Sequence, residues 1–127
     1  MRRLLLLSVV LLASACSGGG DGSAGAVEMT DGQQFSPASL TVAPGTTVTF
    51  SNASSQAHTV TARGDAPSYF SSGGFDSEEA ARENLAEALV GQEGTYEVTL
   101  DEPGTYEYFC IPHEDQGMTG TIVVEEE

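Results

Sequence analysis

The chain contains no lysine and no tryptophan, and its four basic residues are arginines set against 19 acidic residues, giving a formal net charge of −15. This balance excludes nucleic acid as a partner, because the phosphate backbone is bound mainly by lysine and arginine. A surface so acidic favours solubility and repels other anions. It is also what we expect of a halophile's protein, since concentrated salt screens the repulsion between like charges.

A long hydrophobic run is missing as well. The apolar stretch from Leu4 to Ala13 has ten residues, whereas a helix that spans a bilayer needs roughly 20. Arg2 and Arg3 precede the stretch, and small residues follow it at positions 13–15. This order predicts a signal peptide over residues 1–15, and therefore an exported protein.

Cys16 directly follows the predicted signal peptide and is succeeded by a Gly/Ser-rich segment, so residues 16–25 are predicted to form a flexible tether. A cysteine in this position resembles the start of a bacterial or archaeal lipoprotein, although Ala13 stands where such signals usually have leucine. We predict lipidation of Cys16, attachment to the outer face of the cytoplasmic membrane, and a folded domain over residues 26–127. Secretion as a soluble or periplasmic protein is the alternative. Arg2 and Arg3 are compatible with both general and twin-arginine export.

Short segments of alternating polar and apolar residues, rich in β-branched side chains, dominate the predicted domain. They are residues 39–43, 46–51, 57–62, 94–100, 104–110 and 119–125. One helical interval interrupts them at about residues 77–90. Asp76 or Ser77 is its candidate N-cap, Leu85 and Leu89 lie on one face, and Gly91 ends it. The pattern predicts an all-β sandwich with one short inserted helix.

Residues that bind soft or borderline metals are few, and most of them lie close together. Cys110, His113 and Met118 fall within nine residues, and the other histidine, His58, lies on a predicted strand more than 50 residues upstream. Two histidines and one cysteine with a weakly bound methionine form the trigonal site that holds copper for electron transfer. Taken singly, each would be an ordinary core residue. Their joint spacing predicts a copper site.

Other interpretations use some of the same residues. A zinc site would employ the cysteine and histidines but has no need of Met118. A disulfide between Cys16 and Cys110 would join the tether to the domain, a pairing that exported proteins permit. Copper storage or delivery would favour an exchangeable site rich in Met or His, and the sequence has no such tract. It also has no second His cluster, haem-attachment motif or nucleophile–base pair, so it does not predict an enzyme.

Residues 104–113, Gly-Thr-Tyr-Glu-Tyr-Phe-Cys-Ile-Pro-His, and residues 117–124 resemble the C-terminal ligand loop of plastocyanins and of their archaeal relatives, the halocyanins. The spacing from Cys110 to His113 and Met118 is theirs, and also that of pseudoazurins. The resemblance covers about residues 35–124 and implies a cupredoxin-like Greek-key sandwich with a single type 1 copper. His58, Cys110 and His113 would then be the equatorial ligands and Met118 the axial ligand.

The resemblance also implies how electrons would enter and leave. The edge of His113, in an apolar patch with Pro112, would be the electron port for membrane-bound redox donor and acceptor proteins. Thr59 follows the first histidine where many plastocyanins have asparagine, and its hydroxyl can still hydrogen-bond locally. Asn52 is expected to lie near the Cys110 loop and to orient a ligand. The implied function is that of a monomeric one-electron carrier shuttling between membrane-bound complexes.

Overall fold

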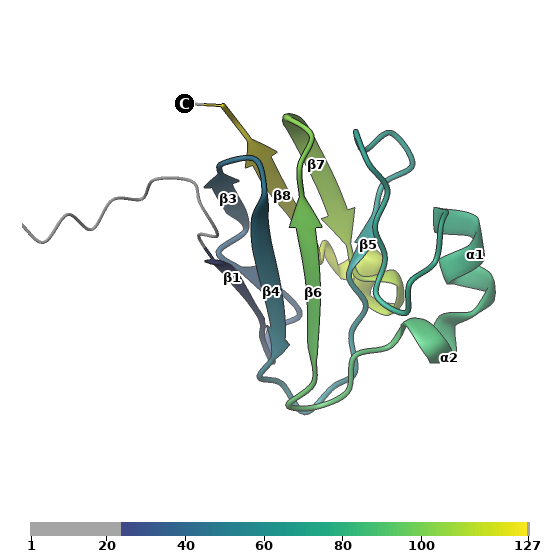
Figure 1. The fold of residues 1–127 in the computed structure, drawn as a ribbon. Helices are drawn as coiled ribbons and strands as arrows, with labels where there is room; N and C mark the ends of the chain where they lie inside the picture. Colours follow the sequence, from purple (N-terminus) through teal and green to yellow (C-terminus); the bar gives the residue numbers. More distant parts are fainter. Residues whose placement is uncertain (1–23, 127) are drawn as a thin grey trace, which may run out of the picture.

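Two four-stranded sheets face each other in the computed structural model, which describes residues 24–126 (Figure 1). One sheet has the order β2 (Phe35–Ser36), β1 (Ala24–Met29), β4 (Thr46–Asn52) and β6 (Thr95–Leu100). The other has the order β3 (Ser39–Val42), β8 (Thr119–Val124), β7 (Gly104–Phe109) and β5 (Thr61–Ala62). The pairs β1–β4 and β3–β8 are parallel, and the other pairs are antiparallel. The predicted all-β, Greek-key sandwich is thus confirmed.

Strand β1 begins two residues before the predicted domain boundary. Ala24 pairs with Thr47 and Gly25 with Val48 in the β1–β4 ladder, whereas the sequence assigned Ala24 and Gly25 to the tether. A Cβ atom on Gly25 would lie 3.0 Å from Leu40 and 3.2 Å from Val48. This glycine therefore permits close packing between the sheets rather than flexibility. The predicted signal peptide and Cys16 lie outside the described residues.

The strand predicted at residues 57–62 is shorter than expected. Within it, β5 pairs with β7, and His58 forms an isolated bridge with Val90. Residues 58–62 are all buried, so their polar and apolar side chains do not divide between an inner and an outer face. The alternation that predicted a half-exposed strand instead marks a segment covered on both sides.

The predicted helical interval holds two short helices, α1 (Glu78–Glu83) and α2 (Leu85–Ala88). Of the two predicted candidates for the N-cap, Ser77 caps α1, and its hydroxyl oxygen accepts from the Ala80 N–H at 3.1 Å. The single predicted helix is interrupted at Asn84, which has the non-helical angles φ −122° and ψ 45°. Its side-chain amide donates to the Ala80 carbonyl oxygen at 2.8 Å, an interaction that competes with the helical backbone. Within the described range, no helix is long and apolar enough to cross a membrane.

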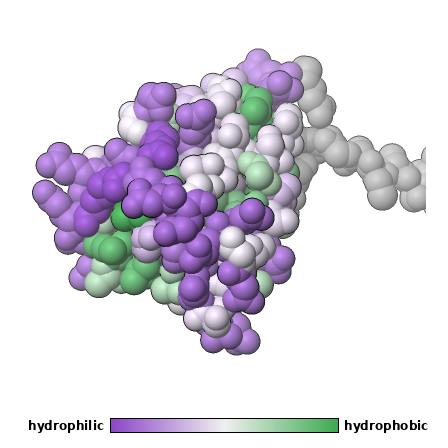
Figure 2. Space-filling view, turned by 180° about the vertical axis from the view of Figure 1, so that it is seen from behind, coloured by the Kyte–Doolittle hydropathy of each residue, from purple (hydrophilic) through white to green (hydrophobic). Residues whose placement is uncertain are grey.

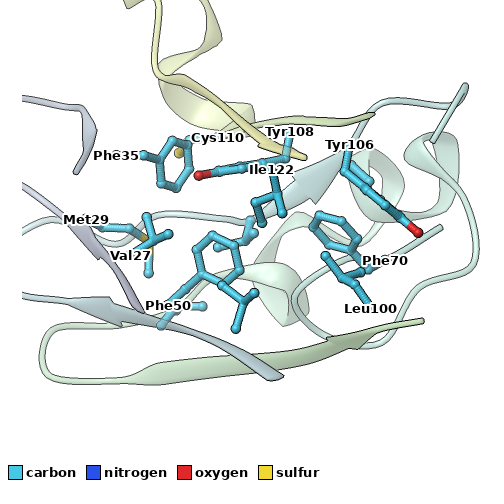
Figure 3. Close-up of a cluster of buried hydrophobic side chains, with 14 of the residues drawn as sticks. Val27, Met29, Phe35, Phe50, Phe70, Leu100, Tyr106, Tyr108, Cys110 and Ile122 are labelled. Atoms are coloured by element: carbon cyan, nitrogen blue, oxygen red, sulfur yellow. The ribbon is translucent and has the colours of Figure 1, made fainter. Parts of the chain in front are cut away.

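Tyr108 lies in an aromatic cluster between the sheets (Figure 3). Its ring meets those of Phe35 and Phe50 edge-on, with centroids 4.7 and 5.2 Å apart, an arrangement that aromatic pairs favour. Gly120 stands opposite in β8, and a side chain there would overlap the tyrosine ring. The Tyr108 hydroxyl is buried and has no hydrogen-bond partner among the described residues. Burial also raises the pKa of Tyr108.

Replacing Tyr108 with phenylalanine should stabilise the protein. The ring is kept, while a hydroxyl that has lost water without gaining a partner is removed, and such a group costs roughly 1–3 kcal/mol. We expect Tyr108→Phe to raise the free energy of unfolding by about 1 kcal/mol in urea denaturation. The matched control is Tyr106→Phe, which should lower it, because Tyr106 donates to the Glu102 carbonyl oxygen at 2.7 Å. A Tyr108→Phe protein less stable than the wild type would contradict the prediction.

Candidate metal centre

Three metal-binding side chains meet where β7 ends. His58 comes from the segment that bridges to Val90, Cys110 directly follows β7, and His113 lies in the 3-10 helix η1 (Ile111–Gln116). Their ligand atoms all lie within 4.8 Å of one another. His58 and Cys110 are fully buried, and His113 is half-buried. Of the three side chains, His113 is therefore the one that solvent reaches.

The two imidazoles and the thiol point their donor atoms toward one another. His58 Nδ1 lies 3.1 Å from His113 Nδ1, and Cys110 Sγ lies 3.7 Å from the former and 3.4 Å from the latter. A point equidistant from the three atoms is about 2.0 Å from each, close to the metal–nitrogen bond length of about 2.0–2.1 Å. Two imidazoles and one thiolate are also the trigonal donor set of blue-copper sites. The residues fit a copper ion.

Backbone hydrogen bonds hold Met118 beside Cys110 and His113. The Cys110 N–H donates to the Met118 carbonyl oxygen at 3.0 Å, and the Met118 N–H donates to the His113 carbonyl oxygen at 3.2 Å. Gly117 has a left-handed φ of 78°, which ends η1 and turns the chain into β8. The Met118 side chain is fully buried in the same cluster as Cys110. The loop from Cys110 to Met118 is thus closed on itself.

Ser54 and Asn52 fix the orientation of His58. The Ser54 Oγ atom lies 2.8 Å from His58 Nε2 and 2.7 Å from Asn52 Oδ1. Because the hydroxyl donates its proton to the amide oxygen, it accepts from the His58 Nε2–H. That tautomer leaves a lone pair on Nδ1, the atom facing Cys110. Burial, and then the nearby His113, lower the pKa of His58, which favours the neutral imidazole that binds metals.

Thr59 supports Cys110 on the other side. Its N–H donates to the Cys110 Sγ atom at 3.3 Å, and its hydroxyl oxygen accepts from the Ile111 N–H at 2.9 Å. Burial raises the pKa of the Cys110 thiol, partly opposed by the hydrogen bond from Thr59. A buried thiol of this kind is inert until a metal displaces its proton. The hydrogen bond then stabilises the thiolate.

The structure brings His58, Cys110 and His113 together and buries Met118 in the adjoining core. The Thr59 hydroxyl hydrogen-bonds to the Thr61 hydroxyl at 3.0 Å and accepts from the Ile111 N–H, whereas the bond to Cys110 comes from the Thr59 backbone N–H. Asn52 differs from expectation, since it contacts Ser54, Gln56 and Val90 on the His58 side rather than the Cys110 loop. Sequence reasoning missed Ser54, because a serine in a polar loop carries no signal that separates it from its neighbours.

Comparison with known proteins gives the family. The family described as copper binding proteins, plastocyanin/azurin family, matches residues 23–125. Plastocyanin A/B of Petroselinum crispum is 39% identical over 99 residues, covering 73% of this chain and 89% of that protein. The chloroplastic plastocyanin minor isoform of Arabidopsis thaliana is 36% identical over 122 residues, covering 91% and 68%. Oxidised plastocyanin from Dryopteris crassirhizoma superposes with a TM-score of 0.58 at 27% identity, covering 79% of this chain and 99% of that one.

The sandwich and its donor set define a cupredoxin with a copper site. The chain belongs to the plastocyanin/azurin family of copper-binding proteins. Copper is its cofactor, as the residues and their resemblance predicted. Plastocyanin-like blue copper proteins function as electron carriers.

Removing the Ser54 hydroxyl should weaken the site. Ser54→Ala leaves His58 Nε2 without this hydrogen-bond partner, while Asn52 Oδ1 keeps the backbone N–H of residue 54 at 2.9 Å. Loss of such an outer partner of a metal ligand typically lowers metal affinity about 10–100-fold. We expect that decrease in a competitive copper titration. Ser55→Ala is the matched control, since its exposed hydroxyl contacts only Asp31, at 3.4 Å, and should leave the affinity unchanged. Equal affinities of the two variants would show that Ser54 does not orient the ligand.

Proposed function

We propose that the protein is a one-electron carrier with a single type 1 copper. Its equatorial ligands are His58, Cys110 and His113, and its axial ligand is Met118. The observation that carries the proposal is the convergence of two Nδ1 atoms and one Sγ atom on a point about 2.0 Å from each. The buried methionine that follows the same loop supports it.

Copper in such a site supplies the exchange of one electron between its two oxidation states. The chain's own task is to keep the donors still while the charge changes, so that little rearrangement accompanies each transfer. Ser54 fixes the ring of His58, Thr59 holds the sulfur of Cys110, and the closed loop holds Met118. The burial of His58 and Cys110 favours a carrier over copper storage or delivery, which would need an exchangeable site.

The electron port in this proposal is the edge of His113. This imidazole is half-buried while the other two equatorial ligands are fully buried, and the neighbouring Pro112 is exposed. Leu89, a large hydrophobic residue that is 37% exposed, precedes Val90, the bridge partner of His58. Apolar residues around the port would let a redox partner approach closely without ordering charged groups.

The partners in this proposal are membrane-bound donor and acceptor proteins. A signal peptide over residues 1–15 would export the chain, and a lipid on Cys16 with the tether over residues 16–25 would keep it at the outer face of the membrane. Hydrophilic residues cover much of the face shown in Figure 2, and hydrophobic residues show as a group at the lower left and as smaller spots elsewhere. Together with the acidic composition, this supports a monomer that stays soluble in concentrated salt.

Copper binding should produce a reversible blue colour. We expect the purified protein to take up one Cu(II), to show an intense thiolate-to-copper absorption band, and to lose and regain the band on reduction and reoxidation. Cys110→Ser should abolish the band. A colourless complex would favour zinc or another use of the site, and copper removed at once by a chelator would favour storage or delivery.

The lipid anchor makes a separate prediction about location. Cys16→Ser should move the protein from the membrane fraction to the soluble exported fraction, because the tether then carries no acyl chain. Quantitative blotting of the fractions measures the shift. A protein whose distribution is the same with and without Cys16 would contradict lipidation and support secretion in soluble form.

A further inference from the structure

The two arginines of residues 24–126 lie together beside the metal centre, although this part of the chain is strongly acidic and has no lysine. Arg63 follows β5 and Arg82 lies in α1, 19 positions later. Both reach Glu114, the residue directly after His113 in η1. The positive charges of the described domain thus converge on the ligand loop.

The carboxylate of Glu114 is shared evenly between them. Arg63 Nη1 donates to Oε1 at 2.8 Å, and Arg82 Nη2 donates to Oε2 at 2.9 Å. Glu78 completes the group at longer range, 3.5 Å from Arg63 and 3.7 Å from Arg82. Two charge-assisted hydrogen bonds to separate oxygens fix both the position and the plane of the carboxylate. They also lower the pKa of Glu114.

Phe109 forms the base of this cluster. Its side chain is fully buried, and the guanidinium carbons of Arg63 and Arg82 lie 3.8 and 5.0 Å from its ring centroid. Cations over an aromatic face are attracted by the negative potential of the ring. The cluster therefore contacts the residue before Cys110 and the residue after His113.

We propose that Arg63, Arg82, Glu78 and Glu114 form an ionic clamp that positions the ligand loop. The clamp ties Glu114 to Arg63, which follows β5 at the edge of the β7–β8 sheet, and to Arg82 of helix α1, which lies outside both sheets. It therefore restrains His113, the half-buried ligand, which lacks the buried surroundings of His58 and Cys110. The inference rests on the proposed copper function, because the advantage of the clamp is a ligand loop that stays still during electron transfer.

The clamp suits a chain expected to work in concentrated salt. Its two short contacts, at 2.8 and 2.9 Å, are no longer than the Debye length of about 3 Å at 1 M salt. Longer-range interactions between the other surface charges are screened under those conditions. The four side chains are about one-third exposed, so a single pair would contribute little, whereas a network of fixed geometry contributes more.

The test compares clamp variants by amide hydrogen exchange in the full chain, with and without copper. The reporting amides are those of Ile111, His113, Gly117 and Met118, which are all hydrogen-bonded within the site. We expect Glu114→Gln and Arg82→Gln to speed their exchange about fivefold, the change for loss of a small ion-pair network. Asp115→Asn is the matched control, being an exposed acid in the same loop with no ion pair among the described residues, and should leave exchange unchanged.

The reduction potential separates positioning from simple charge. Glu114→Gln removes a negative charge and Arg82→Gln a positive one, so a purely electrostatic role shifts the potential in opposite directions and leaves exchange as in the control. Faster exchange in both variants supports the clamp, and exchange matching Asp115→Asn in both overturns it. Glu78→Gln removes only the longer contacts and should increase the exchange rate by a smaller factor. It provides the test if one of the other variants fails to fold. Because exchange is also measured without copper, failure of the wild type to turn blue would refute the proposed function and leave this result intact.

Discussion

Antiparallel pairing of β7 with β8 is the constraint on which the metal centre depends. The ladder runs to the pair Phe109–Thr119, and the next residues, Cys110 and Met118, continue it through one backbone hydrogen bond of 3.0 Å. The thiol of Cys110 and the thioether of Met118 are thereby placed at the two ends of a single loop. Cys110 and Met118 cannot move apart unless the β7–β8 pairing opens. A local turn between them is then enough for His113 to face the thiol.

Polar groups buried near the site form hydrogen bonds with one another. Asn52, Ser54 and His58 form one chain of hydrogen bonds, and Thr59, Cys110 and Ile111 form another. The first set joins residues within one short segment of the chain, and the second joins two segments that are distant in sequence. Removal of one side chain would leave a buried polar partner without its hydrogen bond. The orphan hydroxyl of Tyr108 contrasts with this order and lies in the apolar core, where no such pairing is available.

The sequence predicts the site better than it predicts the edges of the fold. His58, Cys110, His113 and Met118 were accessible because they are rare residues at a diagnostic spacing, and the strands around them alternate clearly. Strand β1 was not among the predicted strands, and Gly25 looks like part of a tether until its contact with Leu40 is known. The interruption of the helix at Asn84 accompanies a hydrogen bond from its side-chain amide to the Ala80 carbonyl oxygen, which the sequence pattern does not reveal. Ser54 and the arginine cluster arise from contacts between distant segments, which no local pattern encodes.

The parallel pairing of β1 with β4 bears on how the molecule would stand at a surface. In that register Met29 lies beside Asn52, next to the His58 network, while Ala24 lies beside Thr47 at the far end of the strand (Figure 1). The segment that precedes Ala24 thus joins the sandwich at the pole opposite the copper-binding end. Under the proposed lipidation of Cys16, the anchor would join the domain at the end opposite the metal centre, which would leave that end free to contact other proteins.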